Sequence, residues 1–198
     1  MFVLLTPSML AALIARVQGR SLARLAHQPL AWWPLGLLAL AAEVALSSAP
    51  IGRQPWAIDW GSSVWMMALS MMIAVLDRNS WQRTGPARWA WGAATLGAAL
   101  NLLVMLANGE HMPLSETART APGVPARDAE PVWHHVAPIG PETRLAWLGD
   151  VLAEPAWLPR HNALSVGDVL LAGGLSVAAY LATDLRAARS PALSHAFV

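Results

Sequence analysis

The sequence predicts an all-α integral membrane protein: a helical bundle of about five transmembrane helices with a short surface helix in a long outer loop. The 198 residues are 56% hydrophobic and only 13% charged, whereas soluble domains carry about 25% charged residues. Five apolar stretches approach the roughly 20 residues with which a helix crosses the hydrocarbon layer. Eleven residues are tryptophan, whose ring favours the membrane–water interface.

The five stretches form a single membrane domain, 1–198, with spans at about 2–17, 30–48, 59–77, 88–108 and 165–184. The first span is the weakest, because it is short and contains Pro7. We expect it to be uncleaved and to lie tilted or shallow. Residues 109–164 form the outer loop.

Arginine supplies every positive charge, and its placement predicts the topology. Three groups fall on one side of the expected spans: Arg16, Arg20 and Arg24; Arg78, Arg83 and Arg88; Arg186 and Arg189. The short loop on the opposite side carries only Arg53. By the positive-inside rule, the N-terminus lies outside and the C-terminus in the cytoplasm. The expected location is the bacterial cytoplasmic (inner) membrane.

The ends of spans four and five carry recognisable capping residues. Ser165 precedes Asp168 by three positions, which predicts a carboxylate form of the capping box at the start of span five. Asn108 and Gly109 end span four, because glycine readily takes the positive φ of a helix exit. Pro113 then prevents the helix from resuming.

Within the outer loop, residues 142–153 are predicted to be helical at the membrane surface. Leu145, Leu148 and Leu152 share one face at helical spacing, as in an interfacial amphipathic helix. The alternatives are a lid over a site or a face for another subunit. Residues 118–131 are rich in Pro and Ala and are expected to be an extended linker.

A polar cluster is predicted beneath the outer surface. Glu43 and Asn101 each lie about seven residues from the outer end of a span, which is roughly 10 Å of depth on the same side. We expect the Asn101 amide to donate to the Glu43 carboxylate. Asp59 and Asp168 mark the outer ends of spans three and five. The cluster is either hydrogen-bonded packing or a site for a proton, an ion or a ligand.

Small residues recur every four positions in two spans, as Ala93, Gly97 and Asn101 and as Gly174, Ala178 and Ala182. Such rows let helices approach closely in lipid. They serve either packing within the chain or a partner chain.

Cofactor, metal and nucleic-acid functions find little support. Cysteine is absent and all six histidines lie outside the spans, so we expect no cofactor held by transmembrane His or Cys. We assign no metal site, no catalytic residue, and no role to His134 and His135. The net charge of +1 gives no reason to expect nucleic acid.

Three segments, in order, resemble a family of small bacterial polytopic membrane proteins known only as a domain of unknown function. They are "NLLVMLANGEHMP" (101–113), "TRLAWLGD" (143–150) and "SVGDVLLA" (165–172). The resemblance implies no activity. It implies that a set of residues acts together: Asn101, Asn108, Gly109, Pro113, Arg144, Gly149, Asp150, Gly167 and Asp168. Arg144 is expected to pair with Asp150, Asp168 or Glu110.

Three functions compete. The first is a non-catalytic accessory or scaffold subunit of a larger respiratory or photosynthetic membrane complex, with the lipid bilayer and membrane subunits as partners. The second is a small carrier or channel that uses the Glu43 and Asn101 cluster. The third is a membrane enzyme that acts on lipid or envelope material at the outer face.

Overall fold

The helices occupy the apolar stretches expected from the sequence. The computed structural model describes residues 2–120, 135–153 and 163–183. Its longer helices are α1 (Phe2–Val17), α3 (Trp33–Leu46), α5 (Pro55–Trp81), α6 (Gly85–Ala107) and α8 (Val166–Ala182). The shorter helices are α2 (Leu22–Ala26), α4 (Ala49–Gly52), α7 (Glu116–Arg119) and the 3-10 turn η1 (Ala146–Leu148). The chain is mostly helical, as predicted, but the described residues also form two small sheets that the predicted all-α fold does not include.

The helix ends follow local rules. Pro55 and Pro86 stand in the first turns of α5 and α6, where the missing N–H leaves no helical hydrogen bond unmade. The capping box predicted at Ser165 and Asp168 is confirmed, because each side chain accepts a hydrogen bond from the other residue's backbone N–H. Asn108 is the C-cap of α6, and Gly109 follows it with a φ of 62°.

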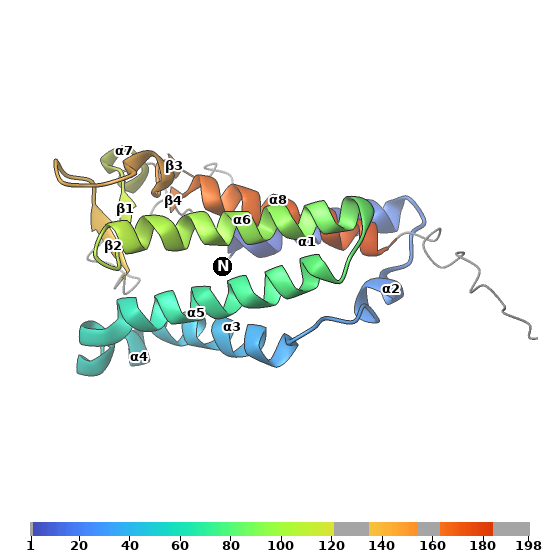
Figure 1. The fold of residues 1–198 in the computed structure, drawn as a ribbon, viewed down its shortest axis with the longest axis horizontal. Coiled ribbons are helices and arrows are strands. Elements are labelled where there is room, and N and C mark those ends of the chain that lie inside the picture. The colour runs from blue at the N-terminus through green and yellow to red at the C-terminus, as the bar shows by residue number, and fades with distance from the viewer. Residues whose placement is uncertain (1, 121–134, 154–162, 184–198) are drawn as a thin grey trace, which may run out of the picture.

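The main helix contacts run in the order α1, α8, α6, α5 and α3. Figure 1 shows α6 beside α8, with α5 and α3 forming the opposite side of the bundle. The strands and α7 gather at one end. The other end carries α2, the end of α5 and the start of α6, and α1 runs toward it from near the middle of the bundle. The last turns of α1, α2 and α5 each contain an arginine.

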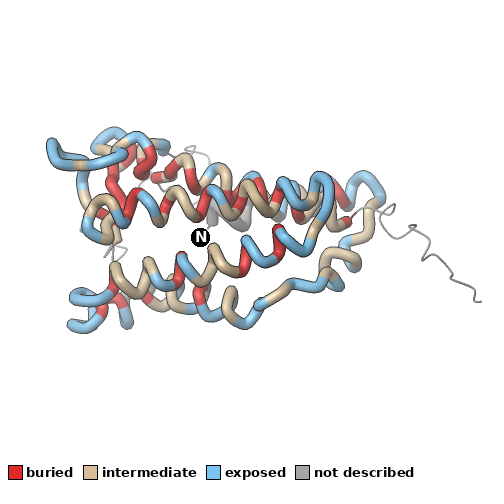
Figure 2. Tube along the Cα trace, in the orientation of Figure 1, coloured by how far each residue is buried: buried red, intermediate tan, exposed pale blue. Residues whose placement is uncertain are grey.

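Glycines bring α6 and α8 into backbone contact. Gly97 lies against the backbone of Gly167 and Leu171, and Gly174 lies against the backbone of α6 around Ala94. These rows of small residues therefore serve packing within the chain. Figure 2 shows the buried residues along the facing sides of the helices and exposed residues on their outer sides.

Two described helices, α5 and α6, are long and apolar enough to cross a membrane. At 1.5 Å per residue they measure about 40 and 35 Å. The apolar parts of α1, α3 and α8 are shorter. Large apolar side chains are exposed along the bundle, among them Leu13, Leu37, Ile58, Leu103 and Val177.

The cap, our name for residues 108–120, 135–153 and 163–165, lies at one end of the bundle, on the side formed by α6 and α8 (Figure 1). Its strand β1 (Met112–Leu114) pairs in parallel with β2 (Val136–Pro138). The other edge of β1 binds the backbone of Asp150, whose N–H donates to the Pro113 oxygen over 2.7 Å. A second sheet pairs β3 (Leu152–Ala153) with β4 (Ala163–Leu164). The chain leaving α6 is thus joined by backbone hydrogen bonds to two later segments.

The surface helix predicted over 142–153 is wrong. This segment holds only the turn η1 and the strand β3. Leu145 takes a left-handed φ of 52°, and the backbone of Asp150 is extended along β1. Leu148 is buried as expected, whereas Leu145 and Leu152 are exposed. Most of the expected linker, 121–131, and His134 lie outside the described residues.

Candidate functional site

A largely buried hydrogen-bond network joins the last third of α6 to the start of α8. The Asn101 amide donates to the Asp168 carboxylate over 2.8 Å, and the Ser165 hydroxyl donates to the Asn101 side-chain oxygen over 2.8 Å. The Ser165 hydroxyl in turn accepts from the Asp168 backbone N–H over 2.9 Å. Both ends of the Asn101 side chain are therefore used to hold the first turn of α8.

Gly167 makes this network possible. A Cβ atom at this position would overlap the Asn101 side chain and lie 2.6 Å from the Gly97 oxygen. The close approach of the two helices thus depends on a glycine between Ser165 and Asp168. Apart from the family resemblance, nothing in the sequence indicates this role of Gly167.

The expected hydrogen bond between Glu43 and Asn101 is not formed, because Asn101 is bound to Asp168 and Ser165. Glu43 lies half-buried in α3, and its carboxyl makes no hydrogen bond to a described residue. Asp59 is exposed near the start of α5. Of the four residues of the expected cluster, the structure brings Asn101 and Asp168 together.

Asn108 clasps the cap to the end of α6. Its amide group donates to the Val104 oxygen over 2.7 Å and to the Arg144 backbone oxygen over 2.8 Å. Its side-chain oxygen accepts from the Arg144 backbone N–H, also over 2.8 Å. The expected ion pair of Arg144 with Asp150, Asp168 or Glu110 is not formed in the described part of the chain. Arg144 ties the loop to the bundle through its backbone instead.

Gly149 and Asp150 lie where the loop meets β1. A Cβ at Gly149 would overlap the Pro113 oxygen, so a glycine permits this close pairing. Asp150 is 9% exposed, and its side chain makes no hydrogen bond to a described residue. Burial raises the pKa of the Asp150 carboxyl well above its usual range, and the Asp168 carboxylate acts in the same direction. Asp150 is therefore a buried acid that favours its neutral form.

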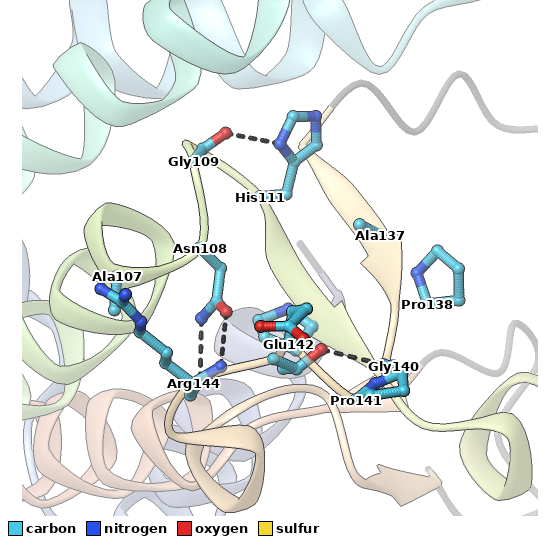
Figure 3. A pocket seen from close by; sticks show the side chains of 12 residues that line it. Ala107, Asn108, Gly109, His111, Ala137, Pro138, Gly140, Pro141, Glu142 and Arg144 are labelled. Atoms are coloured by element: carbon cyan, nitrogen blue, oxygen red, sulfur yellow. Dashed lines mark hydrogen bonds between the residues drawn. The ribbon is translucent and has the colours of Figure 1, made fainter.

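A pocket of about 600 Å³ opens in the cap beside the hydrogen bonds that join Asn108 to Arg144. Its wall includes Asn108, His111, Glu142, Thr143 and Arg144 (Figure 3). The His111 ring Nδ1 lies 2.6 Å from the Gly109 oxygen; because a carbonyl only accepts, Nδ1 carries the proton. The volume falls within the range of small-molecule sites, about 300–1,000 Å³.

Several contacts between α5 and the cap had no signal in the sequence. The Ser63 hydroxyl donates to the Glu110 carboxylate over 2.6 Å. The Trp65 and His135 rings stack with centroids 3.8 Å apart.

At the other end of the bundle, Asn79 clasps the Ala31 backbone through both side-chain groups. An asparagine at a helix end was the available hint, since Asn108 works in the same way.

Residues 28–180 match the model of a family described as a family of unknown function (DUF5317). No curated protein and no solved structure matches the chain. The resemblance to a family of unknown function is therefore confirmed. The residues that carry it form two groups in space, one around Asn101 and one around Asn108.

Proposed function

Since the chain belongs to this family of unknown function, we propose that it is a non-catalytic accessory or scaffold subunit of a larger membrane complex. In this proposal α1, α3, α5, α6 and α8 lie in the cytoplasmic membrane and the cap faces the outer side. The observation that carries the proposal is the cap itself, which hydrogen bonds fix to a bundle with apolar outer faces.

The placement in a membrane is supported by the tryptophans and arginines. Exposed tryptophans stand near both ends of the helices: Trp56, Trp60 and Trp147 toward the cap, and Trp32, Trp33, Trp81 and Trp89 toward the other end. Such belts are typical of the two membrane–water interfaces. Arginines cluster at the end opposite the cap, which favours that end as the cytoplasmic one.

The scaffold role is supported by how the polar residues are used. The side chains of Asn101 and Asn108 form hydrogen bonds that hold segments of the chain in place. The backbone of β1 is paired along both edges. A surface that is already ordered binds a partner without the entropic cost of ordering loops. The cap is therefore suited to present a fixed surface to another subunit.

Membrane placement can be tested with single cysteines, because the natural chain has none. Glu142→Cys in the cap and Gln82→Cys at the opposite end replace exposed residues. The first should react with an impermeant thiol reagent in intact cells, and the second only after the membrane is opened. The reverse order would overturn the orientation.

The scaffold role is tested by a photo-crosslinking residue at the same two positions. We expect position 142 to crosslink to one discrete membrane protein that also co-purifies stoichiometrically in mild detergent. Position 82 serves as the matched control for non-specific capture. A chain that purifies alone and gives no crosslink from the cap would contradict the proposal.

A further inference from the structure

The pocket in the cap presents two opposite charges that are not paired with each other. Glu142 and Arg144 both line it and are exposed. Neither forms an ion pair within the described part of the chain, whereas Arg119 of the same cap is paired with Glu116 at 2.6 Å. In Figure 3 the Arg144 side chain runs toward Ala107, and Glu142 lies between Arg144 and Gly140. A ligand that complements this pocket carries a negative and a positive group.

The surface beneath the pocket is apolar. Ala107, the last residue of α6, lines the pocket. Leu103 lies one turn below it on the same face and is 49% exposed, and Leu106 beside it is 60% exposed. Leu96, two turns farther from the cap, is also exposed. An apolar stripe therefore leads along α6 to the pocket.

From these features we propose that the pocket binds a phosphate ester that carries a primary amine, as the phosphoethanolamine headgroup of a membrane lipid. The inference rests on the membrane placement in the proposed function. The Arg144 guanidinium would bind the phosphate, since its planar donors match phosphate oxygens. The Glu142 carboxylate would accept hydrogen bonds from the ammonium group. The acyl chains would lie along Leu103 and Leu96.

This chemistry separates phosphoethanolamine from other headgroups. A phosphatidylglycerol headgroup has the phosphate but no amine, so Glu142 would face it unpaired. A phosphatidylcholine headgroup has a quaternary ammonium without N–H groups, so it cannot donate to Glu142. We therefore expect the phosphoethanolamine lipid to bind most tightly of the three.

The test is native mass spectrometry of the full chain in detergent, titrated with short-chain phosphatidylethanolamine, phosphatidylglycerol and phosphatidylcholine. Arg144→Gln should weaken binding of the ethanolamine lipid about tenfold, as expected for a lost charge-assisted contact. Glu142→Gln should remove the preference for ethanolamine over choline. Arg119→Gln, a cap arginine outside the pocket, is the matched control and should leave binding unchanged.

Equal binding of the three lipids, or equal behaviour of Arg144→Gln and Arg119→Gln, would overturn the inference. Both pocket substitutions replace exposed side chains, and unchanged thermal melting without lipid will establish that they fold. The last measurement is competition of soluble O-phosphoethanolamine with the lipid. If the soluble ester competes at concentrations equal to those of the lipid, the ligand is a soluble phosphate ester and the proposed lipid is wrong.

The membrane placement is checked separately by extraction of native membranes with alkaline carbonate. If the chain is released, the proposed function fails at its premise. If it is retained but has no headgroup preference, the pocket inference alone fails.

Discussion

Alanine at Gly174 is expected to destabilise the bundle, whereas alanine at the adjacent Gly173 is expected to be tolerated. A methyl group at Gly174 would lie 2.6 Å from the Ala90 oxygen and 2.6 Å from the Ala94 nitrogen. Ordinary contact begins at 3.4 Å, and both neighbours are backbone atoms that cannot rotate away. Helices α6 and α8 would have to separate by most of an ångström. At Gly173 the same methyl group would meet nothing within 4 Å.

The two variants share one contribution to the free energy of unfolding and differ in a second one. Both gain about 0.5–1 kcal/mol from replacing glycine within a helix. Only Gly174→Ala carries the cost of overpacking, typically about 1–3 kcal/mol. The difference between the variants is therefore about 1–3 kcal/mol in the free energy of unfolding, because the shared gain cancels.

Thermal unfolding of both variants in the same detergent measures this difference. For a chain of this size, 1 kcal/mol corresponds to about 2–4 °C in Tm. Gly174→Ala should therefore melt about 2–12 °C below Gly173→Ala. Equal melting temperatures would refute the backbone contact between α6 and α8.

Three further predictions concern the polar residues. Asn101→Leu should lower the free energy of unfolding by about 1–3 kcal/mol, because it leaves the buried Ser165 O–H without an acceptor and removes one donor to the Asp168 carboxylate; a variant that melts like the natural chain would contradict this. Asn108→Ala should speed backbone hydrogen exchange around Arg144 while the helices stay protected, as measured by mass spectrometry, and unchanged exchange there would show that the clasp is unimportant. Burial raises the pKa of Asp150, so the folded protein binds this proton more tightly and stability falls as the pH rises from about 4 toward the raised value. Asp150→Asn should remove that fall from melting curves at pH 4–8; an unaltered pH profile would count against the assignment.

The positions of the long helices could be predicted because a helix in an apolar run needs little information from elsewhere. Each of the five observed long helices overlaps its expected stretch. The segment 142–153 could not be predicted in the same way. Its leucine spacing fits a helix, but its conformation is set by Asn108, 36 positions before Arg144, and by the pairing of Asp150 with Pro113.

The sequence predicts several residues of the candidate site, but it does not predict which of them bind one another. Asn101 stood out as a polar residue in an apolar run, and Asp168 as a helix cap. Depth along the helix was readable, but the direction that each side chain faces was not. Depth alone therefore pairs Asn101 with Glu43, whereas in the structure Asn101 binds Asp168. The sequence gives no indication of the pocket, because its wall combines the exit of α6 with a loop about thirty positions later.

The network around Asn101 also sets an order of events during synthesis. Its hydrogen bonds join residues 64 and 67 positions apart in the chain. At about 5–20 residues per second, a ribosome takes several seconds to cover that distance. In the proposed membrane setting, α6 enters the bilayer first and waits with its asparagine amide unsatisfied until α8 arrives. A nascent chain that stops before α8 therefore keeps the Asn101 side chain without these hydrogen-bond partners in the bilayer. This unsatisfied amide distinguishes an incomplete product from a finished one.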